Sequence, residues 1–233
     1  MLITQELRRY FSKVDWSHTD FTERRPQLAE WALHLLGDLP GPRVLDLGCG
    51  SAALAVELAE RGLAVTGLDL WIDHARQRCA ARGIQVELIE QDMRELDHVE
   101  AFDAVINWDV AGIGMLGETG DREVVRRVQR ALVPGGKFLI QTYSAAYAER
   151  HGIEGLSWNP STRQVCGNVR GRDLAVRLYS PAEWMGMLED CGLYPRSLCS
   201  PQANRSVDDE MMLTLVAERR PPTARLSGPG SRE

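Results

Sequence analysis

The strongest constraint on the fold of this chain is the segment Val44-Leu45-Asp46-Leu47-Gly48-Cys49-Gly50, which is followed by small residues. An apolar strand runs here through an acidic residue into a glycine turn, and the small residues after the turn suit the start of a helix. Gly48 and Gly50 let the backbone turn sharply and approach a ligand closely. The N–H groups at the start of the next helix attract electron-rich groups. The segment therefore predicts a cradle for a nucleoside cofactor in an α/β fold.

The spacing around this turn is compatible with two kinds of cofactor. Gly48, Gly50 and Ala53 fit the looser dinucleotide fingerprint, and Asp69 follows at about the twenty residues expected for a ribose-binding acid. An NAD or FAD site is therefore admissible on spacing alone. Asp46, however, lies at the mouth of the turn, where a carboxylate beside a pyrophosphate would be costly. A ligand with positive charge and no phosphate suits Asp46 better, and S-adenosylmethionine (SAM) has both properties.

Strand-like and helix-like segments alternate along most of the chain. We expect strands at residues 44–47, 63–68, 85–90, 103–107 and 137–142, helices at 51–61 and 73–82, and a helix whose apolar side includes residues 124–132. Ser180-Pro181 opens a further helix that Gly192 closes, and a hairpin-like pair follows around 194–199 and 211–217. The alternation predicts a mostly parallel sheet with helices on both faces.

The remaining segments suggest how the chain is organised around this sheet. Residues 1–40 are expected to form an N-terminal cap and a first helix, and residues 41–220 the cofactor-binding domain. Residues 145–179 fit the alternation poorly, so we interpret them as an insertion over the pocket, with an antiparallel pair around 165–169 and 174–178. Residues 221–233 read as a flexible tail.

Composition indicates a soluble intracellular protein. The 233 residues are 44% apolar and 26% charged, with a formal charge of −6 that argues against broad binding of nucleic acid. No apolar run approaches a membrane span and the start lacks a secretory pattern, so the cytoplasm is expected and a membrane is not. The five cysteines form no C-x-x-C pair and read as reduced thiols, and no metal site is expected.

Several segments resemble the class I SAM-dependent methyltransferases. The run 44–50 and the next strand, Val65-Thr66-Gly67-Leu68-Asp69, carry the first two matches. Three more follow in order at Gln91-Asp92-Met93, Phe102-Asp103-Ala104-Val105-Ile106 and the segment 131–140. The resemblance implies a Rossmann-like α/β fold with seven mostly parallel strands, helices on both faces and the last strand antiparallel. It also implies SAM as cofactor and S-adenosylhomocysteine as product.

The resemblance implies which residues contact the cofactor: Asp46, Gly48, Cys49, Gly50, Asp69, Leu70, Asp92, Met93 and Asn107. The glycines would pass under the methionine part of SAM, and Asp46 would interact with its ammonium group. Asp69 would accept hydrogen bonds from both ribose hydroxyls. Asp92 would accept from the adenine amino group, with Leu70 and Met93 beside the ring. Ordinary structural roles stay open: Asp69 and Asp92 could cap helices, and Met93 could be plain core.

Candidates for the acceptor side follow from the expected strand ends and from the insertion. They are Asn107, Trp108 and Asp109 after the fourth strand, Tyr143 after the fifth, His151 in the insertion, and Tyr10 and His18 in the N-terminal cap. Asp109, Tyr143 and His151 are the candidate catalytic residues, because an imidazole is a common general base and the others stand at strand ends. His151 could instead be a solvated loop histidine, and Asp109 could cap a turn.

The predicted activity is transfer of a methyl group to an oxygen or nitrogen of a small-molecule metabolite by in-line displacement. After the fourth strand the chain reads Asn107-Trp108-Asp109-Val110, unlike the asparagine-proline-proline-aromatic signature of many nucleic-acid amino-methyltransferases. Together with the acidic charge and the insertion, this favours a small-molecule substrate, with the protein a monomer or homodimer. The alternatives are a SAM enzyme of the same fold that does not transfer methyl, and a SAM-binding regulatory module without turnover.

Overall fold

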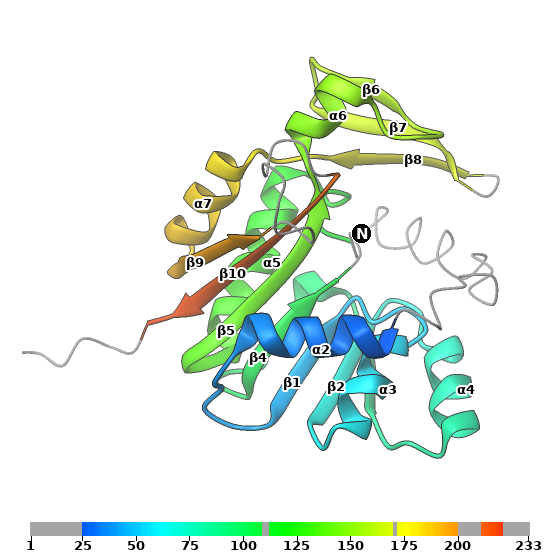
Figure 1. Cartoon of the computed structure of the whole chain (residues 1–233), viewed down its shortest axis with the longest axis vertical. Helices are drawn as coiled ribbons and strands as arrows, with labels where there is room; N and C mark the ends of the chain where they lie inside the picture. The colour runs from blue at the N-terminus through cyan, green and yellow to red at the C-terminus, as the bar shows by residue number, and fades with distance from the viewer. Residues whose placement is uncertain (1–24, 109–111, 170–171, 200–210, 221–233) are drawn as a thin grey trace, which may run out of the picture.

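A seven-stranded sheet forms the centre of the molecule (Figure 1). The computed structural model describes residues 25–108, 112–169, 172–199 and 211–220. Across the sheet the strand order is β3-β2-β1-β4-β5-β10-β9. The strands are β1 (Arg43–Leu47), β2 (Ala64–Asp69), β3 (Glu87–Glu90), β4 (Phe102–Asn107), β5 (Leu132–Tyr143), β9 (Leu193–Cys199) and β10 (Met212–Arg219). β1 to β5 pair in parallel, whereas β10 is antiparallel to β5 and β9, which confirms the predicted Rossmann-like sheet.

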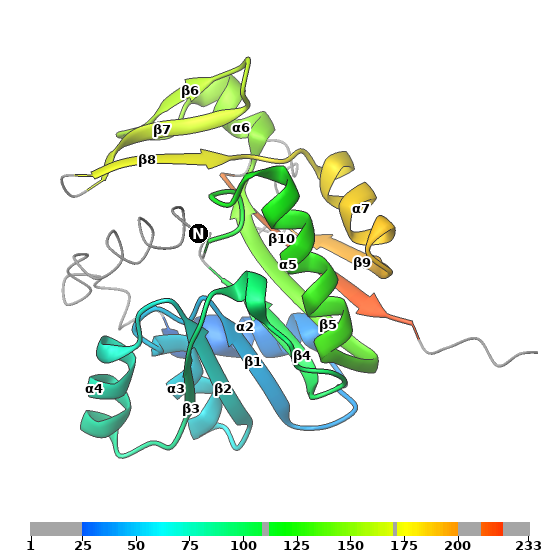
Figure 2. The same cartoon turned by 180° about the vertical axis from the view of Figure 1, so that it is seen from behind.

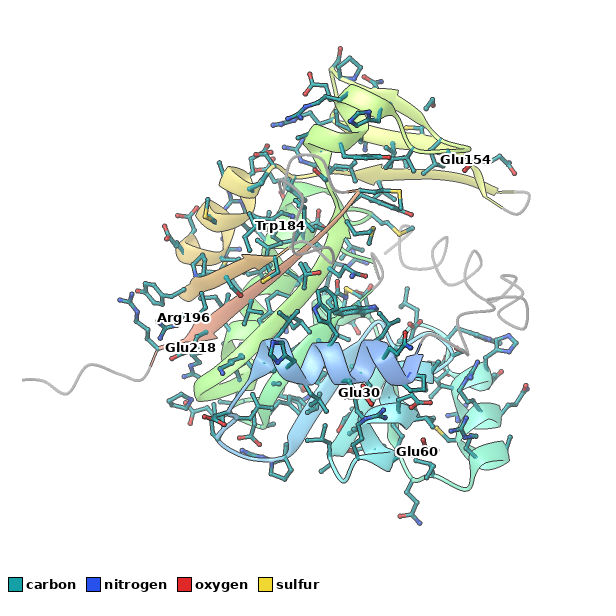
Figure 3. All side chains as sticks on the ribbon, in the orientation of Figure 1. Glu30, Glu60, Glu154, Trp184, Arg196 and Glu218 are labelled. Atoms are coloured by element: carbon teal, nitrogen blue, oxygen red, sulfur yellow. The ribbon has the colours of Figure 1, made fainter. Side chains whose placement is uncertain are left out.

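Helices cover both faces of this sheet, as Figures 1 and 2 show from opposite sides. One face carries α2 (Arg25–Leu36), α3 (Ala53–Glu60) and α4 (Asp73–Arg82), and the other carries α5 (Gly117–Ala131) and α7 (Pro181–Asp190). Strands covered on both sides are apolar on both sides. In β1, Val44 packs in the core below α2 and α3, and its neighbour Leu45 packs in the core below α5 and α7. The second core includes Trp184, whose side chain lies between α7 and the sheet (Figure 3).

Local sequence signals set several helix ends where the sequence predicted them. α4 spans Asp73–Arg82 as predicted, and Gly83 ends it with φ 65°, a left-handed conformation that costs glycine little. Before α7, the Ser180 hydroxyl accepts the Glu183 N–H at 3.2 Å, and the Glu183 carboxylate accepts the Ser180 N–H at 2.8 Å. This reciprocal pair satisfies two N–H groups that the helix itself leaves unbonded.

The start of β5 differs from the prediction. We expected a strand at 137–142, but β5 begins at Leu132 and contains Pro134-Gly135-Gly136. Its pairing with β4 changes register between Phe102 and Ala104, which accommodates the additional residues. The expected start was wrong because proline and glycine usually interrupt regular structure, whereas here Leu132 before them already pairs with Phe102 of β4.

The insertion forms a unit of its own at one end of the molecule (Figure 1). It contains α6 (Ala145–His151) and a three-stranded antiparallel sheet, the cap sheet, made of β6 (Ser157–Asn159), β7 (Gln164–Val169) and β8 (Arg172–Arg177). The predicted antiparallel pair is present, and Val165 pairs with Val176. Both valines pack with Ala148 of α6 in a small separate core. Of the predicted N-terminal cap and tail, residues 1–24 and 221–233 lie outside the described residues.

Candidate functional site

Polar side chains stand at the ends of four neighbouring strands. Asp46 lies near the end of β1, Asp69 ends β2, Asn107 ends β4, and Asp92 follows β3 by two residues. Asp46, Asp92 and Asn107 are almost completely buried, and Asp69 is partly buried. Because parallel strands end at a common edge, the fold brings these groups to the edge where α/β proteins bind ligands.

The glycine turn after β1 has the backbone geometry that its sequence predicted. Gly48 and Gly50 have φ values of 78° and 53°, a region that favours glycine. The N–H groups of Gly48 and Cys49 both donate to the carbonyl oxygen of Leu68, at 2.7 and 3.1 Å. The turn is therefore held against the end of β2, which brings the cradle next to Asp69.

Asp69 connects the glycine turn to the start of the next helical segment. One carboxylate oxygen accepts the Gly50 N–H at 2.9 Å, and the other accepts the Trp71 N–H at 3.2 Å. Burial raises the pKa of Asp69, and backbone N–H donors oppose part of this rise. The residue before α4 is Ile72, so Asp69 is not the cap of that helix. Each oxygen keeps the capacity for a further hydrogen bond, as the predicted contact with ribose hydroxyls requires.

Asp92 has a structural role in addition to its predicted one. It caps a one-turn 3₁₀ helix, Met93–Glu95, by accepting the Arg94 N–H at 2.9 Å. The Arg94 guanidinium also pairs with the same carboxylate, with 2.6 Å between Nη2 and Oδ2. This capping agrees with the alternative that the sequence left open. The ion pair was not foreseen, although an arginine two residues after an aspartate was its visible signal.

Cys49 and Met93 are held by packing on either side of this edge. Burial, followed by the charges of Asp46 and Asp69, raises the pKa of the Cys49 thiol well above its ordinary value, so the thiol stays neutral. A Cβ added to Gly67 would lie 3.0 Å from Cys49 Sγ. Met93 Cε would be only 2.7 Å from a Cβ on Gly112. If Cys49 and Met93 contact the cofactor as predicted, they do so with side chains that are already packed against a neighbouring strand or loop.

Asn107 and Trp108 at the end of β4 are both buried. The Asn107 side-chain amide donates to the carbonyl oxygen of Leu47 at 2.7 Å and so joins the ends of β4 and β1. The Trp108 ring lies edge-on to Trp31 of α2, with 5.3 Å between ring centroids. These contacts hold the end of β4 against β1 and α2. Leu70, another predicted cofactor contact, is partly buried after the end of β2.

The candidate catalytic residues do not form one described cluster. Tyr143 ends β5, is partly buried, and packs against the core of the cap sheet. His151 is exposed at the end of α6, where its ring lies 4.7 Å from that of Tyr147. Asp109 lies outside the described residues, as do the acceptor-side candidates Tyr10 and His18. The exposure of His151 agrees with the alternative of a solvated histidine.

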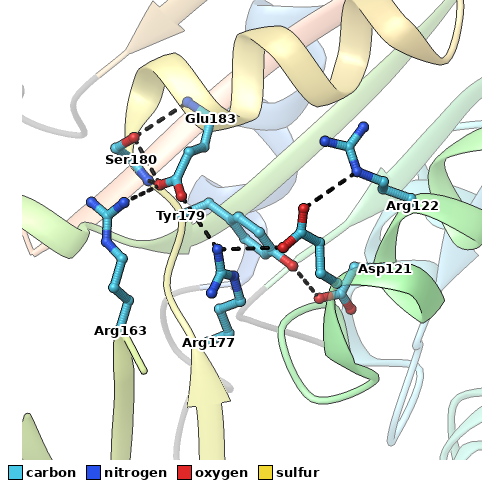
Figure 4. A network of polar contacts seen from close by, with 8 residues as sticks. Asp121, Arg122, Arg163, Arg177, Tyr179, Ser180 and Glu183 are labelled. Atoms are coloured by element: carbon cyan, nitrogen blue, oxygen red, sulfur yellow. Dashed lines mark hydrogen bonds and ion pairs between the residues drawn. The ribbon is translucent and has the colours of Figure 1, made fainter. Parts of the chain in front are cut away.

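A buried polar network joins the loop after β4 to the cap sheet and α7 (Figure 4). Asp121 of α5 accepts the Tyr179 hydroxyl at 2.6 Å and the Gly114 N–H at 2.9 Å. Arg177 of β8 lies 3.3 Å from the Glu183 carboxylate and 3.6 Å from that of Glu118. The sequence had not singled out Asp121. The sequence pattern that could have identified it is an acidic residue on the side of α5 that otherwise carries valines.

Two kinds of site can be tested against the described residues. No group of three or more histidine, cysteine, aspartate or glutamate side chains suited to a metal ion occurs among them. Within the same part of the chain, every helix is too short or too polar to cross a lipid bilayer.

Comparison with known families finds a similarity over part of the chain. Residues 44–136 match a family model described as a methyltransferase domain. The strand order, with β10 antiparallel, agrees with the fold that the resemblance to the class I SAM-dependent methyltransferases implied.

Particular relatives have names that refer to methyl transfer. The ubiquinone biosynthesis O-methyltransferase of Escherichia coli O7:K1 (strain IAI39 / ExPEC) is 29% identical over 169 residues, which cover 70% of this chain and 66% of that protein. This chain spans about two thirds or less of the length of such curated relatives.

Solved structures share the fold at lower identity. A protein of Pyrococcus horikoshii OT3 superposes with a TM-score of 0.74 and 20% identity, covering 91% of this chain and 99% of that one. The 1,6-didemethyltoxoflavin-N1-methyltransferase of Burkholderia thailandensis, solved with 1,6-didemethyltoxoflavin and S-adenosylhomocysteine bound, has a TM-score of 0.64 and 16% identity, with coverages of 94% and 88%.

Proposed function

We propose that the protein transfers the methyl group of SAM to an oxygen or nitrogen atom of a small-molecule metabolite. The observation that carries this proposal is the set of carboxylates at one edge of the sheet, from Asp46, Asp69 and Asp92. The carboxylates of Asp46 and Asp69 disfavour a pyrophosphate at this partly dry edge, whereas Arg94 balances the charge of Asp92. The three carboxylates together complement a ligand with an ammonium group, ribose hydroxyls and an amino group, and SAM offers all three.

The order of these residues along the edge suggests how SAM would lie. Asp46 on β1 would face the ammonium group, and the turn at Gly48 and Gly50 would pass under the methionine part. Asp69 on the adjacent β2 would accept from the ribose, and Asp92 after β3 from the adenine amino group. This order agrees with the sheet, in which β1, β2 and β3 are consecutive neighbours.

Positioning would supply most of the catalysis. SAM supplies a methyl group on a positively charged sulfur and leaves as S-adenosylhomocysteine. Correct orientation of the reacting groups contributes up to roughly 7–11 kcal/mol, whereas a general base adds typically about 10²–10⁴ in rate. Tyr143 is proposed to orient the acceptor from the end of β5, and Asp109 or His151 to accept a proton where the acceptor must lose one. A neutral amine would need little help of this kind.

The acceptor is proposed to be a metabolite in the cytoplasm, used by a monomeric or homodimeric enzyme. The named relatives include one O-methyltransferase and one N1-methyltransferase, so both acceptor atoms stay in the proposal. The formal charge of −6 further supports a small molecule over nucleic acid.

Calorimetry and mass spectrometry test the proposal together. Purified protein is titrated with S-adenosylhomocysteine and then incubated with SAM carrying a ¹³C-labelled methyl group and a small-molecule extract of the source organism. We expect saturable binding and an extract compound that gains one labelled methyl group. Absence of binding would contradict the SAM site. Release of methylthioadenosine would instead indicate a SAM enzyme of the same fold that does not transfer methyl. Binding without consumption of SAM would indicate a SAM-binding regulatory module.

A further inference from the structure

Two polar side chains face each other across β5 and β10 in the interior of the sheet. Thr214 pairs directly with Gln141 in the antiparallel register. Gln141 is 7% exposed and Thr214 is completely buried. Their neighbours one pleat further from the carboxyl edge of β5, Leu139 and Val216, belong to the apolar core under α2. The pair therefore lies at the boundary between the apolar core and the polar residues near the carboxyl end of β5.

The Thr214 hydroxyl is buried and has no hydrogen-bond partner among the described residues. Its Oγ1 makes no hydrogen bond within that part of the chain, although Gln141 lies directly across from it in the register. Such a group costs the folded protein free energy, because water would bind it in the unfolded chain. An unsatisfied buried group in a native protein calls for an explanation, and a ligand group that completes the hydroxyl would supply one.

The position of the pair connects it to the cofactor cradle. Asp46, Ile106 and Leu139 are register partners across β1, β4 and β5, so their side chains share one face of the sheet. Trp108 and Gln141 lie two residues further along their strands and face the same way. Two inter-strand spacings, or about 10 Å, separate β1 from β5, which is the length of a small organic molecule. A molecule that reaches from the cradle past Trp108 would meet Gln141 and then Thr214.

We propose that Gln141 and Thr214 form a binding subsite for an uncharged hydrogen-bonding group of the methyl acceptor, namely a hydroxyl, a carbonyl or an amide. The inference rests on the proposed function and specifies the substrate class of that site. An amide and a hydroxyl each donate and accept hydrogen bonds and carry no charge. A carboxylate or ammonium group buried here would lack an opposite charge from either residue, which would be costly.

The variant Thr214→Val tests the subsite because it removes the hydroxyl and keeps the shape of the side chain. We expect the unfolding midpoint to rise by about 2–4 °C, because an unpaired buried hydroxyl is gone. For the labelled compound identified with the wild type, we expect KM to rise about tenfold, with the Kd for S-adenosylhomocysteine within about twofold. Gln141→Leu is expected to raise the same KM. A purely structural threonine would not give higher stability together with weaker acceptor binding.

Thr66→Val is the matched control in the same sheet. The buried Thr66 hydroxyl donates to the Glu87 carboxylate at 3.0 Å, so this variant should lower the unfolding midpoint and leave the acceptor KM unchanged. If the wild type methylates nothing, the proposed function fails and the subsite with it. If the wild type is active but both subsite variants keep its KM, the subsite alone is overturned. A lower unfolding midpoint for Thr214→Val, or a methylated compound without a hydroxyl, carbonyl or amide, would overturn it as well.

Discussion

Replacing Asp69 by alanine is expected to weaken the binding of S-adenosylhomocysteine at least tenfold while the protein stays folded. Each carboxylate oxygen accepts one backbone N–H, from Gly50 at 2.9 Å and from Trp71 at 3.2 Å, and retains capacity for a ribose hydroxyl. A hydrogen bond to a charged group contributes about 1.5–3 kcal/mol. The loss of one such bond already corresponds to about tenfold in Kd, and the loss of both would give more.

The same variant should be less stable than the wild type. Loss of the bonds to Gly50 and Trp71 costs about 1.5–3 kcal/mol each, because both bonds are to a charged group. Because burial raises the pKa of Asp69 above its unfolded value, the ionised carboxylate opposes folding at neutral pH, and its removal offsets part of this cost. The glycine turn also keeps the two hydrogen bonds that Leu68 accepts from it.

Isothermal titration calorimetry with S-adenosylhomocysteine measures the effect, and circular dichroism checks the fold. Asp73→Ala is the matched control, because Asp73 is a half-exposed aspartate nearby in the first turn of α4, paired with Arg76 at 3.2 Å. The control should bind like the wild type. A folded Asp69→Ala variant with unchanged affinity would show that the ribose lies elsewhere.

Two further predictions concern ionisable groups that hold the fold. Burial alone would raise the pKa of Asp103, but hydrogen bonds from Arg43, the closest at 2.9 Å, outweigh it and keep that pKa below its ordinary value. The resulting stability is present above the unfolded pKa of about 3.9 and is lost as pH falls through the lower folded pKa. Asp103→Asn should therefore have a lower free energy of unfolding in urea than the wild type near pH 7, and this difference should shrink below about pH 4. A difference that does not change with pH would contradict this reasoning. Tyr179→Phe removes the hydroxyl that donates to buried Asp121 at 2.6 Å and should lower the free energy of unfolding by about 1–3 kcal/mol, and a variant as stable as the wild type would show that the pair contributes nothing.

The features that the sequence predicted best depend on short stretches of chain. α4 has the predicted bounds because Asp73 suits its first turn and Gly83 its end. The glycine turn between Asp46 and Gly50 follows from local backbone freedom in the same way. The parallel sheet also followed from the sequence, because alternating strands and helices leave few other arrangements.

Contacts between distant segments were much harder to predict. β5 begins five residues before the expected start because Leu132 pairs with Phe102 of β4, although the Pro-Gly-Gly segment after Leu132 locally indicates a break. The sequence left open whether His151 is a base or a solvated histidine, and its exposure at the end of α6 became visible only in the folded insertion. Neither outcome could be read from neighbouring residues, since both depend on which element packs alongside.

The sequence by itself determined the fold class, the glycine turn and the acidic residues at the strand ends, because these follow from short stretches of chain. Only the tertiary structure decided which buried polar residues meet. Gln141 and Thr214 lie far apart in the sequence and become neighbours through the antiparallel β10, and Asp121 meets Tyr179 only where α5 approaches the segment before α7. The physical reason is that a turn depends on its own residues, whereas a buried hydroxyl or carboxylate depends on groups brought to it by the whole fold.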